Sequence, residues 1–234
     1  MSTLFKSNAV FLHVPKTGGT FFRKIIIALD LRIFDFGYEH ADMERTLHSF
    51  KHYPANAVRS SFLLRKNIDS HVKQCFKFCF VRNPYGWYES YWRFMQDINW
   101  NDLTAYRSKN KFGIYVDLWN PVNLLLPYAN TDFNVFMQNV LNEEPGFLTK
   151  LYEQYADPKH INYVGRQETL EEDLIRIFDL LKITYNKNIF EKTPRANESR
   201  TPKPIWNEEL KNRVYDSERS VFEKYKYNRD GSVT

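Results

Sequence analysis

Residues 13–20, which read His-Val-Pro-Lys-Thr-Gly-Gly-Thr, constrain this chain more than any other segment. A short apolar run at residues 9–12 precedes them, and an apolar stretch with helical spacing follows at residues 21–29. An apolar run, a glycine-containing turn and a helical pattern in this order predict a strand, a loop and a helix. Such a loop presents backbone N–H groups at the start of a helix, where they can bind a phosphate or sulfate group. The sequence therefore predicts an anion-binding loop.

The side chains of this loop suit an anion. Gly18 and Gly19 let the backbone approach the ligand closely, Lys16 adds a mobile positive charge, and Thr17 and Thr20 add hydroxyl donors. The usual loop for nucleoside triphosphates reads G-x-x-x-x-G-K-[ST], with the lysine after the second glycine. Here the lysine precedes both glycines, so the segment is a different kind of anion loop; the alternative is an ordinary tight turn with a solvated lysine.

Strands and helices are predicted to alternate along the rest of the chain. We expect further strands at 33–36, 76–81 and 161–165, and helices at 42–50, 85–96, 133–141, 144–155, 168–181 and 206–225. This alternation predicts an α/β fold, with a parallel sheet flanked by helices in a single domain over residues 1–234. Residues 97–132 are expected to form an insertion that covers the substrate, and residues 186–204 a long loop.

Charge and cysteine content exclude several classes of partner. The net charge of +5 suits a polyanionic ligand, but the chain has no run of consecutive basic residues and no nucleic-acid motif, so no nucleic-acid partner is expected. Cys75 and Cys79 lie in one predicted strand region, residues 75–81, too far apart for a disulfide, and are expected to be reduced. No residues have metal-ligand spacing, and no apolar stretch reaches about 18 residues, so neither a metal nor a membrane span is predicted.

A second group of candidate ligand-binding residues follows the strand predicted at 76–81. The segment from residue 78 reads Phe-Cys-Phe-Val-Arg-Asn-Pro-Tyr, and Ser90 follows in the next predicted helix. A parallel strand delivers Arg82 to the carboxyl edge of the sheet, where ligands of α/β proteins bind. Arginine offers forked donors for a phosphate and serine offers a hydroxyl, although an arginine at the end of a strand more often forms a salt bridge.

Together these motifs resemble those of sulfotransferases that use 3′-phosphoadenosine-5′-phosphosulfate (PAPS), closest to the carbohydrate-type branch. P-K-T-G-G-T resembles their 5′-phosphosulfate loop, and F-x-F-V-R-N-P with a downstream serine resembles their 3′-phosphate element. The resemblance implies a P-loop-type sheet and transfer of a sulfuryl group from PAPS to an acceptor hydroxyl, with a carbohydrate favoured and no metal required. It implies that residues 16–20 hold the phosphosulfate, with Lys16 acting on the leaving oxygen, and that Arg82 and Ser90 hold the 3′-phosphate.

The same resemblance indicates a general base. Many short sulfotransferases of this type carry a histidine in K-H-x-[ST] between the two cofactor motifs, and His40 lies in the matching place, with Glu39 and Asp42 departing from the pattern. A neutral histidine suits deprotonation of a hydroxyl. A surface or capping histidine is the alternative. Glu39 and Asp42 are reserve bases; His13 competes, but the resemblance places it under the anion turn, where we expect structural hydrogen bonding.

Further matches with this family are weaker. Residues 165–173 resemble G-R-x-E-x-L-x-x-D and are expected to be structural, with Arg166 and Glu168 as a bracing pair, and residues 197–199 resemble an N-x-S loop. Eukaryotic carbohydrate sulfotransferases often carry an N-terminal membrane anchor. Met1 stands directly before the first predicted strand here, so we expect a cytoplasmic protein. Two other functions stay open: a P-loop nucleotide kinase, which needs a Mg²⁺ site and the G-K-[ST] order, and a non-catalytic nucleotide-binding module, which needs no base.

Overall fold

The structure is a computed structural model that describes residues 2–36, 40–52, 70–97, 107–109, 115–117, 121–194 and 199–234. The chain divides into two compact units. The first consists of Met1–Val81 and Glu153–Asn197, and the second of Arg82–Tyr152 and Glu198–Thr234. The first unit contains the anion loop predicted from the sequence, and the second unit begins with the predicted arginine.

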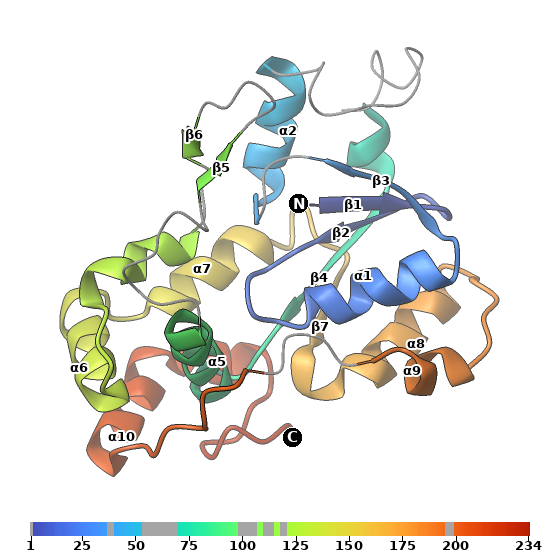
Figure 1. Cartoon of the computed structure of the whole chain (residues 1–234). Helices are drawn as coiled ribbons and strands as arrows, with labels where there is room; N and C mark the ends of the chain where they lie inside the picture. Colours follow the sequence, from blue (N-terminus) through green and yellow to red (C-terminus); the bar gives the residue numbers. More distant parts are fainter. Residues whose placement is uncertain are drawn as a thin grey trace. The chain divides into compact units, whose positions relative to one another are not determined.

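A five-stranded sheet forms the centre of the first unit (Figure 1). Its strands run in the order β3 (Arg32–Phe36), β1 (Ser2–Phe5), β2 (Ala9–Leu12), β4 (Phe76–Val81) and β7 (Tyr163–Arg166). The pairs β2–β4 and β4–β7 are parallel, whereas β1 is antiparallel to both β2 and β3. The predicted α/β fold is confirmed, but the sheet is mixed and not wholly parallel. The difference comes from β1, which was not predicted because its sequence, Ser-Thr-Leu-Phe, lacks the continuous apolar run that marked residues 9–12.

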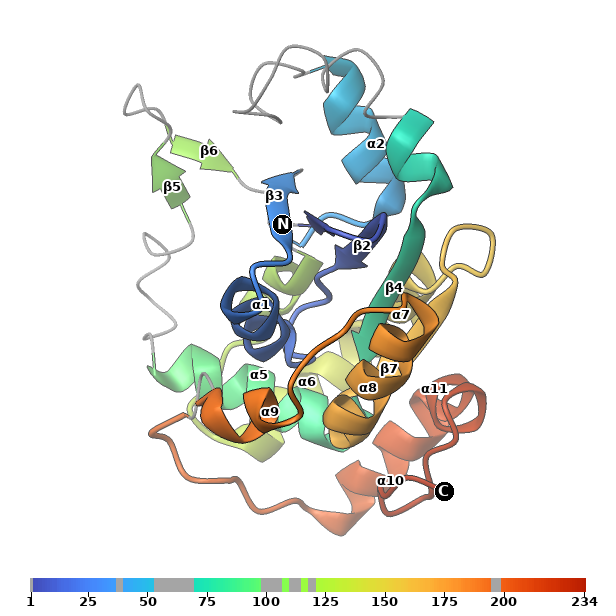
Figure 2. The same ribbon diagram turned by 90° about the vertical axis from the view of Figure 1, so that its right-hand side faces the viewer.

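Helices α1 (Gly19–Ala28), α8 (Leu170–Leu180) and α9 (Asn188–Lys192) pack on one face of this sheet (Figures 1 and 2). Alternate residues of β4 decide which face is apolar, because Phe78 and Phe80 join the core with α1, α8 and α9 while Lys77 and Cys79 point to the opposite face. The shared core consists of Phe5, Ala9, Phe11, Phe22, Ile25, Ile26, Phe78, Phe80, Leu174, Ile177, Phe178, Ile183 and Phe190. Helix α9 lies within residues 186–204, which were predicted to be a loop; its single turn and a half is too short for a periodic pattern.

A buried carboxylate fixes β7 to α8. Asp173 accepts hydrogen bonds from the Tyr163 hydroxyl at 2.6 Å, the Arg166 N–H at 2.8 Å and the Thr169 hydroxyl at 2.8 Å. Burial, together with the bond to Asp173, raises the pKa of Tyr163 to about 12. Gly165 is needed here because a Cβ atom would lie 2.6 Å from the Phe80 ring. The G-R-x-E-x-L-x-x-D segment therefore supports the fold at the junction of β7 and its helix.

The second unit is mainly helical. Its elements are α5 (Pro84–Asp97), β5 (Arg107–Lys109), β6 (Tyr115–Asp117), the 3₁₀ helix η2 (Pro121–Tyr128), α6 (Phe133–Glu143), the start of α7 (Phe147–Tyr155), α10 (Glu208–Ser217) and α11 (Arg219–Lys224). The helix predicted at 206–225 is thus two helices, interrupted at Glu218. The predicted covering insertion, 97–132, contributes β5, β6 and η2, and the rest of it lies outside the described residues apart from its two ends. The first unit also contains α2 (Met43–His52) and the 3₁₀ turn η3 (Gln167–Thr169), and residues 70–74 before β4 are helical as well.

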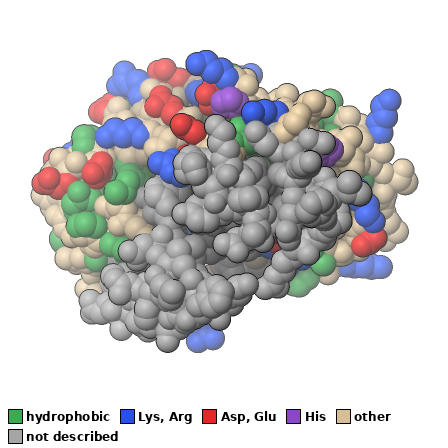
Figure 3. Space-filling model, turned by 90° about the horizontal axis from the view of Figure 1, so that it is seen from above, with side chains coloured by type: hydrophobic (Ala, Val, Ile, Leu, Met, Phe, Trp, Pro, Cys, Tyr) green, Lys and Arg blue, Asp and Glu red, His purple; other side chains and the backbone are tan. Residues whose placement is uncertain are grey.

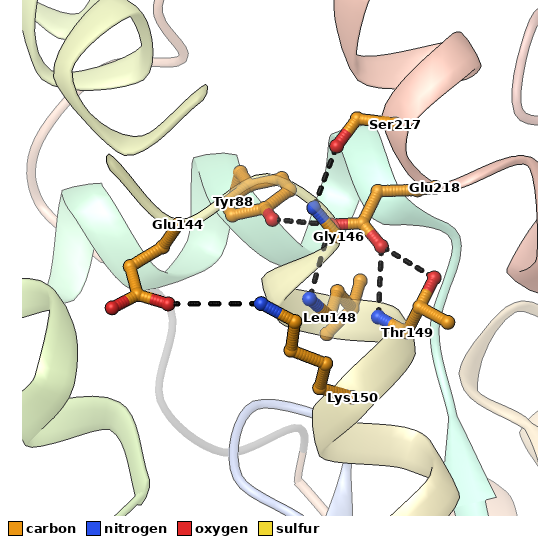
Figure 4. A network of polar contacts seen from close by, with 8 residues as sticks. All are labelled: Tyr88, Glu144, Gly146, Leu148, Thr149, Lys150, Ser217 and Glu218. Atoms are coloured by element: carbon orange, nitrogen blue, oxygen red, sulfur yellow. Dashed lines mark hydrogen bonds and ion pairs between the residues drawn. The ribbon is translucent and has the colours of Figure 1, made fainter. Parts of the chain in front are cut away.

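Glu218, at this interruption, is completely buried and ties three elements together (Figure 4). Its carboxylate accepts from the Tyr88 hydroxyl at 2.6 Å, from the backbone N–H groups of Leu148 (3.0 Å) and Thr149 (2.8 Å), and from the Thr149 hydroxyl at 2.7 Å. The two N–H groups belong to the first turn of α7, where a negative charge is favoured. Burial and the neighbouring Glu218 raise the pKa of Tyr88 well above its usual range, so its hydroxyl keeps its proton and donates.

Aromatic rings fill the interior of the second unit. Trp87 and Tyr91 of α5 stack with ring centroids 5.5 Å apart, and Phe133 of α6 meets Trp206 edge-on at 4.6 Å.

On the face shown in Figure 3, basic and acidic side chains of the described residues are interspersed. The net positive charge is therefore not gathered into one patch on the described part of this face.

Candidate active site

The predicted strand–loop–helix is present in the first unit. Strand β2 ends at Leu12 and α1 begins at Gly19. Gly18 is the N-cap residue of α1 with a left-handed φ of 87°, and no described side chain caps this helix end. A side chain at Gly18 would be strained and would also place its Cβ 2.9 Å from Cδ2 of Leu170. The left-handed backbone therefore favours glycine at this position, in keeping with the anion-binding loop expected from the sequence.

The two threonines of the loop differ in their surroundings. Thr17 is fully buried, and its hydroxyl donates to the Val14 carbonyl at 3.0 Å. A hydroxyl has a single proton to donate, so this side chain closes the loop, whereas the sequence suggested a donor to the anion. Thr20, in the first turn of α1, and Lys16 are both partly exposed. These two side chains remain the candidates for direct contact with a ligand.

Two histidines meet beside the loop. Nδ1 of His40 lies 3.0 Å from the backbone oxygen of His13, and the two rings have centroids 4.6 Å apart. A carbonyl oxygen only accepts, so Nδ1 of His40 carries the proton and donates. Nε2 of the neutral ring then holds the lone pair that can accept a proton. The histidine proposed as the base is therefore held to the first residue of the anion loop, in the tautomer that a base needs at Nε2.

Both imidazoles are neutral at physiological pH. Burial, with a smaller contribution in the same direction from positive charge including that of Lys16, lowers the pKa of His40 to about 3, and its hydrogen bond to His13 only partly opposes this. Burial and the neighbouring His40 also hold the pKa of His13 well below its usual range. A bound anion would add negative charge and raise the pKa of His40 toward the range in which a base is effective.

Backbone conformation singles out Lys16 and His40. Within the described part of the chain, seven non-glycine residues have a positive φ. Five of them are in turns that commonly require it: the β1–β2 turn and the residues that follow the ends of α1, α8 and α11, namely Ser7, Asn8, Asp30, Lys182 and Lys226. The other two are Lys16 (φ 63°) and His40 (φ 57°). Such conformations cost of order 1–3 kcal/mol and gather at functional sites.

The reserve bases are placed as follows. Asp42 is buried, accepts the Arg45 N–H at 2.8 Å in the first turn of α2, and forms an ion pair with the Arg45 guanidinium. Its carboxylate therefore caps a helix. Glu39 lies outside the described residues.

Arg82 is fixed through its backbone in the second unit. The Tyr152 hydroxyl accepts from the Arg82 N–H at 3.0 Å and donates to the Arg82 carbonyl at 2.9 Å. Asn83 caps the next helix, because its side-chain oxygen accepts the Gly86 N–H at 2.8 Å. A Cβ on Gly86 would lie 3.0 Å from Nε of Arg82, so the arginine side chain lies over the first turn of α5.

Ser90 shares that helix face. Residues four apart lie one above the other on a helix, so Ser90 lies one turn beyond Gly86. Arg93, three residues further, donates through its guanidinium to the backbone oxygens of Thr201 (2.6 Å) and Ser199 (3.1 Å). The end of the predicted N-x-S loop is thereby held against α5, while Asn197 and Glu198 lie outside the described residues. Arg93 was not singled out from the sequence, although its spacing from Ser90 is the signal that could have found it.

The described residues contain neither a metal-binding cluster nor a helix that could span a membrane. Among them, no group of three or more His, Cys, Asp or Glu side chains is arranged to hold a metal ion. None of their helices has the length and apolar character needed to cross a membrane. Both cysteines are buried and unbonded to each other, as predicted.

Comparison with known proteins gives one clear relationship. Neither the curated proteins nor the solved structures contain a significant match to this sequence. A model of the sulfotransferase family, in contrast, matches residues 5–228 and so spans both units and every candidate residue described above. The loop at Lys16, the paired histidines and the arginine at the end of β4 all lie within this match. The chain therefore belongs to the sulfotransferase family.

Proposed function

We propose that this sulfotransferase moves a sulfuryl group from PAPS to a hydroxyl of a carbohydrate acceptor. Family membership supports sulfuryl transfer, and the resemblance of the anion loop to the carbohydrate-type branch supports the choice of donor and acceptor. The donor supplies an activated sulfuryl group, and the protein has to hold it, align the acceptor oxygen and take up a proton. This chemistry, like phosphoryl transfer, depends mainly on positioning and electrostatic stabilisation.

The first unit supplies the groups for the transfer step. In the proposal, the acceptor oxygen attacks sulfur in line, the bond from sulfur to the bridging oxygen breaks, and the acceptor proton passes to Nε2 of His40. Lys16 neutralises the charge that develops on the bridging oxygen as adenosine-3′,5′-bisphosphate leaves. The backbone of residues 17–20 holds the sulfate end of the donor, with Gly18 and Gly19 allowing close approach and Thr20 adding a hydroxyl.

The second unit supplies the contacts that distinguish PAPS from other adenine nucleotides. We assign the 3′-phosphate to the Arg82 guanidinium and the Ser90 hydroxyl, which share one face of α5. Arg93 donates to two backbone carbonyls and therefore shapes this region by holding residues 199–201.

One observation carries the proposal: Nδ1 of His40 donates to the carbonyl of His13, which leaves Nε2 as the only proton acceptor of a ring tied to the anion loop. The positive φ of His40 and its fixed tautomer support this role. A nucleotide-binding module without catalysis would need the loop and the arginine but not the base.

The test is turnover with radiolabelled PAPS and a panel of saccharides, tyrosine peptides and small phenols. We expect label on a saccharide, and loss of transfer by roughly 10²–10⁴ in His40→Asn with unchanged affinity for adenosine-3′,5′-bisphosphate. Label on a peptide or phenol alone would move the acceptor to that class. Bisphosphate binding without transfer to any acceptor would favour the non-catalytic module.

A further inference from the structure

Tyr155 is the residue whose contacts the proposed reaction leaves unexplained. It is the last residue of α7 and is 1% exposed, and its hydroxyl donates to the backbone oxygen of His40. Burial raises the pKa of Tyr155 well above its usual range, so the phenol keeps its proton and donates. This contact joins residues 115 positions apart in the sequence.

We propose that Tyr155 is a positioning residue for sulfuryl transfer, holding the His40 backbone so that Nε2 of the imidazole keeps one fixed direction. The inference rests on the proposed role of His40 as the base. It concerns how the base is held, and the base itself remains the group that takes the proton.

The backbone of His40 has a conformation that needs a restraint. Its φ of 57° is unfavourable for a residue with a side chain, so the surrounding structure has to stabilise it. The hydroxyl of Tyr155 supplies such a restraint at the His40 carbonyl. Removing that hydroxyl would take this donor away from a part-buried carbonyl and would leave the backbone of His40 free to relax.

The imidazole ring of His40 is restrained as well. With the backbone held by Tyr155, the hydrogen bond from Nδ1 to the His13 carbonyl fixes the ring as well. The hydrogen bonds at the backbone oxygen and at Nδ1 of His40 together determine where Nε2 lies. His13 is contiguous with the anion loop, so the base and the loop keep a constant separation.

Tyr155 is itself in contact with the central sheet. The Cys79 thiol lies 3.9 Å from the Tyr155 backbone oxygen, and Cys79 is on β4, next to β2 in the sheet. The restraint on His40 is thus anchored on the same sheet from which the anion loop starts. A chain of contacts runs from β4 through Tyr155 and His40 back to the end of β2.

Tyr155→Phe tests this with the loss of one oxygen atom. The matched control is Tyr185→Phe in the same unit, because the Tyr185 ring packs on Phe178 and Phe190, away from the histidines in sequence and in contacts. We expect Tyr155→Phe to lower kcat by roughly tenfold to a hundredfold while KM for PAPS and the affinity for adenosine-3′,5′-bisphosphate stay unchanged. Tyr185→Phe should match the wild type in all three.

A second measurement needs no turnover. Nitrogen NMR of the wild type should show His40 as a single Nδ1–H tautomer, and Tyr155→Phe should show the mixture of an unconstrained imidazole. The wild type should also show a slowly exchanging Tyr155 hydroxyl proton near the His40 backbone, which can be measured even if the variant does not fold. Absence of that protected proton, or a Tyr155→Phe protein with unchanged kcat and tautomer, overturns the proposal. Lack of turnover by the wild type on every acceptor would refute the proposed function instead, and the NMR result would still decide whether Tyr155 positions His40.

Discussion

A Cβ atom on Gly19 would lie 2.1 Å from Cδ2 and 2.4 Å from Nε2 of His13. The histidine ring therefore packs directly against Gly19 and leaves no room for a side chain there. The ring cannot easily withdraw, because it is 9% exposed and stacks on Phe11 with centroids 5.8 Å apart. His13 therefore sets the shape of the anion loop through its ring, while its backbone carbonyl accepts a hydrogen bond from Nδ1 of His40. The histidine that begins the loop motif has a steric function.

Gly19→Ala should lower the free energy of unfolding by about 1–3 kcal/mol, the usual cost of forcing extra atoms into a packed site. It should also abolish binding of adenosine-3′,5′-bisphosphate. The double variant His13→Ala with Gly19→Ala should be more stable than the sum of the two single effects predicts, because removing the ring removes the clash. Denaturant unfolding of the four proteins measures this coupling, and additive effects would contradict the steric account.

Lys16→Ala should reduce kcat by about 10²–10³, the loss expected when one group that stabilises developing charge is removed. The free energy of unfolding should change little, because the Lys16 side chain is partly exposed. Lys24→Ala is the matched control, since Lys24 is an exposed lysine on α1 in the same unit. Steady-state kinetics with saturating donor make the comparison, and equal rates for the two variants would remove the role assigned to Lys16.

Arg82→Ala should weaken binding of adenosine-3′,5′-bisphosphate by about 1.5–3 kcal/mol, the contribution of a hydrogen bond to a charged group. Adenosine-5′-monophosphate lacks the 3′-phosphate, so its affinity should change much less. Arg219→Ala serves as the control, because this exposed arginine pairs with Asp216 at the junction of α10 and α11. Titration calorimetry with both nucleotides is the measurement. Equal losses for the two would mean that Arg82 does not recognise the 3′-phosphate.

The two buried histidines should make the free energy of unfolding depend on pH. Their pKa values are lowered in the folded protein, to about 3 for His40, whereas an unfolded histidine titrates near 6.5. Below about pH 6.5 the unfolded chain therefore binds more protons, and stability falls as pH falls, by up to about 1.4 kcal/mol per pH unit for each histidine. Above that pH both states are neutral and the effect vanishes.

His40→Asn isolates one of these contributions, because the asparagine amide can still donate to the His13 carbonyl but does not titrate. Between about pH 6.5 and 5, the free energy of unfolding, measured with denaturant, should fall less steeply with falling pH in the variant than in the wild type. The difference in slope should correspond to about one proton taken up on unfolding. The same slope in both proteins would show that His40 is as easily protonated folded as unfolded.

Local signals in the sequence were sufficient to predict some of these features and not others. The strand–loop–helix around Lys16 and the helix predicted at 85–96 depend on neighbouring residues, and both are confirmed. Strand β1 was missed because half of its residues are polar, and helix α9 because five residues carry no helical periodicity. The bond from Tyr155 to His40 was missed for another reason: it depends on how the sheet brings distant segments together, and no local pattern encodes that. Sequence motifs thus point to the candidate residues, whereas the contact between Tyr155 and His40 could not be predicted from them.

Glu218 gives a prediction for the second unit that is independent of catalysis. Its two oxygens accept four hydrogen bonds, and all four donors are fixed: a protonated tyrosine, a threonine hydroxyl and two backbone N–H groups of α7 (Figure 4). In Glu218→Gln one oxygen becomes an NH₂ group, which has the same size but can only donate. Whichever oxygen is replaced, the NH₂ group then faces the backbone N–H of Leu148 or of Thr149, which can only donate.

We expect Glu218→Gln to lower the free energy of unfolding by about 1–3 kcal/mol for each donor left without an acceptor. Glu223→Gln, an exposed position on α11, makes the same chemical change and should be nearly neutral. Hydrogen exchange should locate the loss, because the Leu148 and Thr149 amides would become less protected while the amides of β2 and β4 would keep their protection. If the amides of α7 exchange as in the wild type, the carboxylate is not what holds the start of this helix. If all amides lose protection together, the two units unfold as one cooperative structure, and Glu218 stabilises the sheet and the anion loop as well as the helices it contacts.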